Sequence, residues 1–269
     1  MRRARFLRDC LLLLLAASAC SRNPDRSAAS PLTPTAEAQP TALRGSTATG
    51  PDRDAVAALK TMSDYLSKLH SFELVSDASL DAITKANQRI QIGGIAHYKV
   101  RQPGIRLDFD TDTRSRRYFY DGKQFTIYSP KLRLYASAPA PPTNRAFLKA
   151  LYEKYGISLP LEDLFRWNDG DESDLKSLTS GFNVGPAMID GVATDHWAFR
   201  QGKFDWEVWI ERGQQPLPRK LVIVDRSDPT YPAYIARLKW TLNPPFADNI
   251  FKFTPDNDAA RIHIAQFAG

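Results

Sequence analysis

The side chains of this sequence that could carry out acid–base or metal chemistry are few and widely spaced. The four histidines are His70, His97, His196 and His263, and no two of them have a spacing that would place both on one metal ion. His196 follows Asp195 directly, and adjacent side chains of a strand point to opposite faces. We therefore expect no metal site and no cofactor, and we interpret these histidines as structural or solvent-facing.

A catalytic site would have to be assembled from polar residues that lie far apart in the chain. It would need two or more of Asp121, Asp163, His196 and Glu207 to converge in one cleft. The sequence contains no nucleophile elbow, phosphate-binding loop or dinucleotide fingerprint. We therefore predict no catalytic residue and no enzyme activity.

An acidic run could be mistaken for a calcium loop. It contains Asp169, Asp171, Glu172 and Asp174. The run lacks the central glycine and the terminal glutamate that complete such a loop. We expect a solvated acidic loop here rather than ordered calcium.

Aromatic and aliphatic residues give a clearer signal, because they recur at every second position of predicted strands. This spacing places them on one face of each strand, while Trp209 falls on the opposite face. The residues that share a face are Tyr118, Tyr120, Phe125 and Ile127 in one group, and Trp197, Phe199, Phe204 and Trp206 in a second.

The first residues of the chain form an export signal. Arginines precede the apolar run Leu11 to Leu15, and the small residues Ala17, Ser18 and Ala19 stand directly before Cys20. The apolar run is shorter than the ~20 residues that cross a bilayer. The motif resembles the lipobox of bacterial lipoproteins, which implies lipidation of Cys20; ordinary signal cleavage is the alternative. Ser21, in place of the Asp that retains some lipoproteins in the inner membrane, favours the outer membrane.

Removal of residues 1–19 changes the charge and the thiol content. The segment carries four Arg and one Asp, so the formal net charge falls from +6 to +3. The basic balance therefore gives no reason to expect nucleic-acid binding. The two cysteines are Cys10 and Cys20, which leaves the remaining chain without a disulfide, a thiolate metal site or a cysteine nucleophile.

The composition divides the mature chain into a tether and one domain. Residues 20–52 are rich in Ser, Thr, Ala and Pro and are predicted to be a disordered tether. The folded domain is predicted over residues 53–269. Apolar residues at helical spacing predict a helix over 54–70, and a second over 144–155 that Gly156 ends. Pro160 is expected to open a short helix over 159–167.

The rest of the domain alternates with a period of two and predicts about ten antiparallel strands in two meanders. Asp121-Gly122 and Asp190-Gly191 are hairpin signals. Gly93-Gly94 is expected to interrupt a strand, and the tail with Ile262 and Ile264 could add an edge strand. The order helix, meander, helices, meander indicates the α+β class, without the alternating units of a parallel sheet.

Several segments together resemble the predicted periplasmic proteins of domain of unknown function 2092, which are similar in fold to the LolA-like lipoprotein carriers. The similarity covers roughly residues 55–255. It implies a curved antiparallel half-barrel whose concave face is covered by helices, and it implies no substrate. The segments are the helix 57–66, Arg101-Gln102-Pro103, residues 118–123, residues 156–164 and residues 251–255.

In such a half-barrel, one face of each strand would line a concavity beneath the helices. We hypothesise that the eight inward-facing residues named above line an apolar cavity that binds acyl chains or a similar ligand. The alternative is that they form a filled core, which would leave a structural or interaction protein of the envelope. The expected partners are the membrane, through the lipid on Cys20, and an apolar ligand or lipoprotein; the oligomeric state is left open. Unlike the freely diffusing carriers, a lipidated protein would receive its ligand at a tethered domain.

Overall fold

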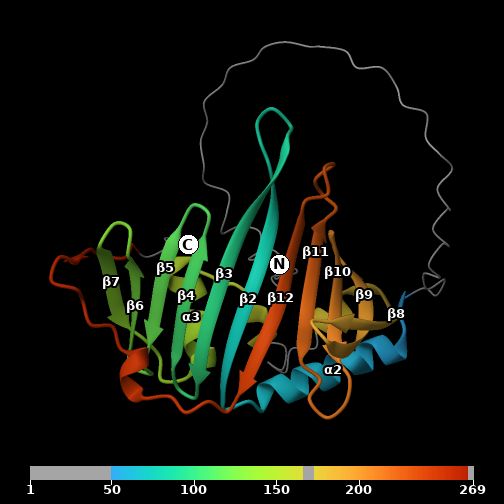
Figure 1. Cartoon of the computed structure of the whole chain (residues 1–269), viewed down its shortest axis with the longest axis horizontal. Helices are drawn as coiled ribbons and strands as arrows, with labels where there is room; N and C mark the ends of the chain where they lie inside the picture. Colours follow the sequence, from blue (N-terminus) through green and yellow to red (C-terminus); the bar gives the residue numbers. More distant parts are fainter. Residues whose placement is uncertain (1–49, 166–172, 266–269) are drawn as a thin grey trace.

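The computed structural model describes residues 50–165 and 173–265. These residues form one open sheet of 13 strands with helices beside it (Figure 1). The predicted signal, Cys20, the acidic residues Asp169, Asp171 and Glu172, and the side chain of Asp174 lie outside the described part. None of the described helices combines the length and the apolar character that a bilayer crossing requires.

The elements have the following bounds. The helices are α2 (Arg53–Ser67), α3 (Asn144–Tyr155) and α4 (Ser173–Lys176), with the 3-10 helices η1 (Glu162–Phe165) and η2 (Asp248–Phe251). The first strands are β1 (Gly50–Pro51), β2 (Ser71–Ile83), β3 (Arg89–Arg101), β4 (Ile105–Thr111), β5 (Ser115–Tyr120), β6 (Gln124–Ser129) and β7 (Leu134–Pro139). They are followed by β8 (Leu178–Ile189), β9 (Val192–Gln201), β10 (Phe204–Glu211), β11 (Pro218–Asp225), β12 (Ala233–Leu242) and β13 (Ala260–Arg261).

Two antiparallel meanders build the sheet. The strand order is β1-β8-β9-β10-β11-β12-β2-β3-β4-β5-β6-β7-β13, so β12 pairs with β2 and joins the meanders at the centre. The predicted Asp-Gly turns connect β5 to β6 and β8 to β9. The predicted meander organisation is therefore confirmed.

The prediction of about ten strands is too low. Two of the 13 strands, β1 and β13, contain two residues each and pair in parallel with β8 and β7. A pairing as short as that of β1 leaves no alternating pattern in the sequence, whereas β13 lies in the tail for which an edge strand was expected, directly before Ile262. Gly50 and Pro51, which the sequence places in the tether, thus belong to the sheet, and Asp52 N donates to Gly181 O at 2.8 Å.

The expected interruption at Gly93-Gly94 is also wrong. β3 continues through both glycines, because Gly93 pairs with Ser79 and Gly94 with Ala78 of β2. A Cβ atom on Gly94 would lie 3.0 Å from Thr111 Cγ2 and 3.3 Å from the Asp110 carbonyl oxygen of β4. Glycine at this position therefore permits the close approach of β4.

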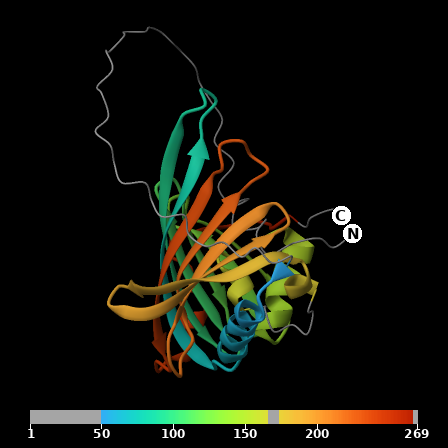
Figure 2. The same cartoon turned by 90° about the vertical axis from the view of Figure 1, so that its right-hand side faces the viewer.

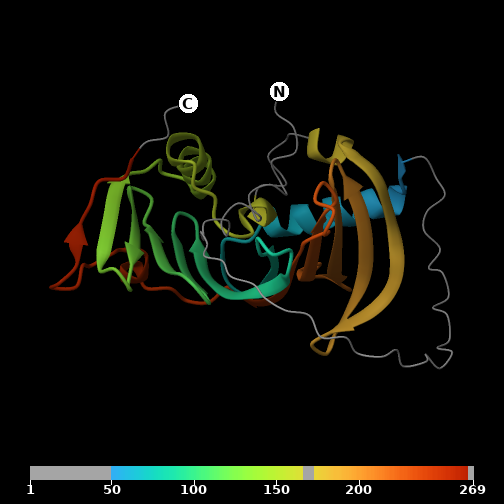
Figure 3. The same ribbon diagram turned by 90° about the horizontal axis from the view of Figure 1, so that it is seen from above.

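The sheet is strongly bent, and the helices α2 and α3 lie on its inner side (Figures 2 and 3). The buried positions of α2 include Ala55, Leu59, Met62 and Leu66, at the helical spacing of the predicted apolar face. α3 has the predicted bounds. Thr143 accepts a hydrogen bond from Ala146 N at its start, and Gly156 ends it at φ 63°.

Within residues 159–165, the described part of the helix expected over 159–167, the structure contains only the 3-10 helix η1; residues 166 and 167 lie outside the described part. Leu161 has φ 61°, a left-handed conformation that an α-helix does not contain. It is 1% exposed, and Tyr98 donates its hydroxyl hydrogen to the carbonyl of neighbouring Pro160. Buried contacts therefore hold this segment in a shape that its sequence does not favour.

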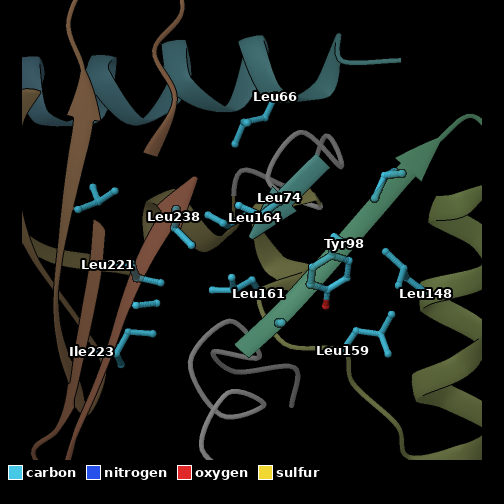
Figure 4. Packing of buried hydrophobic residues seen from close by; sticks show 14 of the residues in the cluster. Leu66, Leu74, Tyr98, Leu148, Leu159, Leu161, Leu164, Leu221, Ile223 and Leu238 are labelled. Atoms are coloured by element: carbon cyan, nitrogen blue, oxygen red, sulfur yellow. The ribbon is translucent and has the colours of Figure 1, made fainter. Parts of the chain in front are cut away.

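The core lies between the inner face of the sheet and these helices. Figure 4 shows leucines of α2, α3 and the η1 segment facing side chains of β2, β3, β11 and β12. Both meanders thus contribute to one hydrophobic cluster, whose burial is the main stabilising contribution to the fold.

Gly181 gives a test of this packing. A Cβ atom there would lie 2.8 Å from Phe199 Cδ1 and 3.1 Å from Pro51 Cβ. The Phe199 ring is buried and stacked on Trp206 with centroids 4.4 Å apart, so it has little room to move. We expect Gly181→Ala to lower the free energy of unfolding by about 1–3 kcal/mol, measured by urea denaturation. Ser180→Ala is the matched control and should change it by less than about 0.5 kcal/mol; equal stabilities of the two variants would contradict the described packing.

Candidate functional site

A cavity of about 190 Å³ opens between the C-terminal end of α2 and the first turns of α3. Its floor is formed by the first residues of β2 and β4 and the last residues of β3. Eight of its lining residues are apolar or aromatic: Leu66, Leu69, Phe72, Tyr98, Val100, Ile105, Leu148 and Leu159. The other six are Ser67, Gln102, Thr143, Asn144, Arg145 and Glu162.

The apolar lining follows from the two periodicities of the chain. Leu66 belongs to the apolar stripe of α2, and Leu148 to that of α3. Tyr98 and Val100 stand two positions apart on β3, so both face the interior. The cavity therefore lies where helix stripes and the inner face of the sheet meet without filling the space between them.

Asn144 fixes the helix that forms one wall of the cavity. Its Oδ1 accepts a hydrogen bond from Gly104 N at 2.9 Å, and its Nδ2 donates to Arg101 O at 2.6 Å. Arg101 is the last residue of β3 and Gly104 lies in the β3–β4 connection, so the first residue of α3 is anchored to the sheet. This anchor sets the distance between α3 and α2 at the cavity.

The polar lining residues are unevenly distributed. Ser67, Gln102, Thr143 and Arg145 are exposed, whereas Asn144 and Glu162 are buried. Glu162 Oε2 accepts a hydrogen bond from Leu159 N at 2.9 Å. The cavity thus has a mostly apolar interior, with the buried Asn144 and Glu162 also in its lining, and an exposed polar rim with one guanidinium group.

The first group of predicted lining residues packs against α3. Tyr120 stacks on Phe147 with centroids 4.1 Å apart, and Phe125 contacts Phe147 and Tyr155. The Tyr120 hydroxyl donates to Pro141 O at 2.5 Å, and burial raises the pKa of Tyr120 to about 12. Burial also raises the pKa of Tyr118. Ile127 is half-buried on the same face.

The second group lies on the inner face of β9 and β10. Trp197, Phe199, Phe204 and Trp206 are all buried, and Phe199 stacks on Trp206. Neither group contributes a residue to the lining of the 190 Å³ cavity. The structure places these residues in the packed cluster on either side of it.

The residues that do line the cavity were missed because they carry no distinctive signal. Leu66, Phe72 and Val100 are predicted as buried positions by their helix or strand spacing, like many others. No local pattern indicates that the space between two helices remains partly empty. The depth of the cavity depends on how α3 is anchored by Asn144, a contact 43 residues distant from Arg101.

Two of the four polar residues considered for catalysis, His196 and Glu207, are brought into contact, whereas Asp121 lies apart from them in the β5–β6 turn. His196 Nε2 is 2.6 Å from Glu207 Oε2, and the imidazole stacks on Trp209, which faces outward as predicted. Asp121 accepts hydrogen bonds from the backbone N–H groups of Lys123 and Gln124 in the β5–β6 turn. The side chain of Asp163 lies outside the described residues. Over residues 50–165 and 173–265, no group of three or more His, Cys, Asp or Glu side chains is placed to hold a metal ion.

Solved structures with similar folds include proteins of diverse bacteria. An uncharacterized conserved protein of Thermus thermophilus has a TM-score of 0.46 at 11% identity, covering 78% of this chain and 99% of that one. The lipoprotein LppX of Mycobacterium tuberculosis has a TM-score of 0.45 at 12% identity, covering 73% and 98%. The LolA superfamily protein NE2245 of Nitrosomonas europaea has a TM-score of 0.37 at 10% identity, covering 74% and 97%. Similarities of this degree assign no ligand to the chain.

The curated proteins contain no match to this sequence. A family model described as "Predicted periplasmic protein (DUF2092)" matches residues 55–265. The match spans both meanders, α2 and α3, and therefore the whole framework of the cavity. The chain thus belongs to the DUF2092 family of predicted periplasmic proteins.

Proposed function

We propose that this protein is a lipidated cell-envelope protein that binds an apolar ligand, such as an acyl chain, between its sheet and its helices. The observation that carries the proposal is the cavity of about 190 Å³ between α2 and α3, with eight apolar or aromatic lining residues. Binding sites for small ligands are commonly concave and apolar with a few polar groups at defined places. Binding would require burial of the ligand and no covalent step.

The dimensions of the cavity support a short apolar segment as the ligand. An apolar protein cavity of about 150 Å³ is large enough to bind benzene. Each methylene group that leaves water contributes about 0.8 kcal/mol, so a few buried carbons suffice for weak binding. A longer chain would extend past the exposed rim.

The rim suits the polar end of an amphiphile. Ser67, Gln102 and Thr143 are exposed at the mouth together with the Arg145 guanidinium. A ligand with its chain inside the cavity would leave its head group beside these residues and in contact with water. This orientation avoids the cost of burying a charged head group.

The sequence supports a location at the membrane surface of the envelope. The basic and apolar segments of residues 1–19 and the small residues before Cys20 are those of an exported lipoprotein. In this proposal residues 20–49 connect the lipid anchor to the domain, and Ser21 favours the outer membrane. A ligand would therefore be delivered to an anchored domain.

Ligand occupancy is the first test. The full chain, expressed in a bacterium and purified without detergent extraction of ligand, should carry bound lipid in native mass spectrometry. Organic extraction should release it, and the extracted protein should bind a fluorescent fatty-acid probe in a saturable way. A uniformly ligand-free protein that also fails to bind the fluorescent probe would contradict the proposal. It would favour an interaction protein with a filled core.

Filling the cavity is the second test. Val100→Phe adds a ring inside the cavity, and Leu69→Trp adds volume at its half-buried edge. Each variant should weaken probe binding at least about tenfold, since the space for several methylene groups is lost. Val75→Phe on β2 is the matched control, because Val75 faces the outer side, and it should bind like the wild type. Wild-type affinity in both cavity variants, with intact circular dichroism, would exclude this cavity as the site.

The lipid anchor is tested separately at Cys20. In a bacterial host that processes lipoproteins, the wild-type chain should begin at a lipid-modified Cys20 and fractionate with membranes. Cys20→Ser should lose the modification and the membrane association. Mass spectrometry of the N-terminal peptide provides the measurement; an unmodified wild-type N-terminus would instead indicate ordinary signal cleavage.

A further inference from the structure

A second pocket lies on the inner face of β2, β3 and β4, toward the projecting ends of β2 and β3. Its volume is about 30 Å³, enough for about two water molecules. No charged residue lines it: the lining residues are Ser76, Ala78, Ser79, Leu80, Ile92, Gly93, Gly94, Ala96, Phe109, Thr111, Pro160 and Tyr234.

This pocket is distinct from the cavity between α2 and α3. Pro160 lines the pocket, whereas its neighbour Leu159 lines the cavity. Tyr98, which also lines the cavity, donates its hydroxyl hydrogen to the Pro160 carbonyl. The Leu159–Pro160 segment therefore lies between the two spaces, and no residue is shared by their linings.

Ser76 is the unusual member of the pocket lining. The residue is 1% exposed, and its Oγ has no hydrogen-bond partner in the described part of the protein. On the sheet it pairs with Ala96 on one side and Leu238 on the other. Buried hydroxyl groups are nearly always hydrogen-bonded, because an unpaired one loses its hydration without compensation. A polar group in the adjoining pocket would supply the missing partner.

An apolar strip leads from the pocket to the outside. The pairing of β12 with β2 ends at Leu80, and that of β4 with β3 ends at Gly94, so the rest of the β2–β3 hairpin extends beyond its neighbouring strands (Figure 1). On the inner face of this projection, Leu80 pairs with Ile92 and Ala82 with Ile90. Leu80 and Ile92 line the pocket, and Ile90 is 43% exposed. The strip therefore continues the pocket wall out along the hairpin.

We propose that the pocket and this strip form a second binding site, for an uncharged amphiphile that consists of an alkyl chain ending in a hydroxyl group. The hydroxyl group occupies the pocket and hydrogen-bonds with Ser76, and the chain lies along Leu80, Ile92 and Ile90. The volume admits a hydroxymethyl-sized end group. A carboxylate is disfavoured, because no cation lines the pocket to compensate its lost hydration. This site goes beyond the proposed function, since it uses different residues and a different ligand class.

The test compares two probes of equal chain length, 1-decanol and decanoate, on the delipidated full chain at pH 8 by isothermal titration calorimetry. We expect saturable binding of 1-decanol that is at least about tenfold tighter than that of decanoate at this site. Ser76→Ala should weaken 1-decanol binding about two- to tenfold, the effect of losing one hydrogen bond. Ala78→Leu, which fills the pocket, should abolish it.

Matched controls separate this site from general effects on folding. Ala57→Leu places the same substitution on an exposed position of α2, and Ser71→Ala removes a hydroxyl at the other end of β2, where it donates to Pro244 O. Both should bind 1-decanol like the wild type. Because Ser76 Oγ has no partner to lose, Ser76→Ala should keep or raise the thermal unfolding midpoint; a clear fall would overturn the proposal.

The remaining outcomes show whether 1-decanol binds at the second site or in the cavity between α2 and α3. Undiminished 1-decanol binding in Ala78→Leu or in Ser76→Ala overturns the proposal and leaves the pocket as a site for water. Loss of 1-decanol binding in Val100→Phe with retention in Ala78→Leu assigns the probe to the cavity between α2 and α3, which supports the proposed function and rejects the second site. Loss of 1-decanol binding in Ala78→Leu, together with retained binding in Val100→Phe, supports the second site. This conclusion does not depend on the result for the fatty-acid probe.

Discussion

The pairing of β12 with β2 is the contact on which the rest of the structure depends. It runs from Tyr234 opposite Leu80 to Leu242 opposite Phe72 and joins two meanders that lie far apart in the chain. Without it, each meander would expose the apolar face that now forms part of a shared core. The pairing also places β2 and β3 at the centre of the sheet, where both interior spaces lie. Non-local strand pairing of this kind is costly in chain entropy and is offset by the common core.

The interior is divided rather than continuous. The Leu159–Pro160 segment separates the cavity beside α3 from the pocket beside Ser76, and Leu161 enters the core at φ 61°. A bulky residue with a positive φ is strained, and such strain persists when the surroundings determine it. Here the hydrogen bonds from Tyr98 to the Pro160 carbonyl and from Leu159 N to Glu162 hold the backbone around Leu161 in this conformation. The two spaces differ in chemistry as a consequence: one has a rim with Arg145, and the other has no charged residue in its lining.

Much of the local structure could be predicted from the sequence. The apolar spacing marks α2 and α3, Gly156 marks the end of α3, and the Asp-Gly pairs mark two hairpins. Predictions failed where long-range contacts override local preference: Gly93 and Gly94 continue a strand because β2 pairs with them, and Gly50 and Pro51 join the sheet because β8 is adjacent. The aromatic residues were predicted correctly to face the inner side of the sheet. Tyr120 stacks on Phe147 and Phe199 stacks on Trp206, however, so these rings lie in the packed core and not in the lining of the cavity.

The sequence by itself determined the compartment signal, the absence of cysteine beyond Cys20, the helix and hairpin positions, and which side of each strand faces inward. These properties depend on residue type and on periods of two or 3.6 residues, and such information is local. Only the tertiary structure decided where the interior stays open. A cavity is the space that remains after distant elements have packed, and its position depends on contacts such as Asn144 with Arg101 and Gly104. No local pattern records the space that packing leaves unfilled.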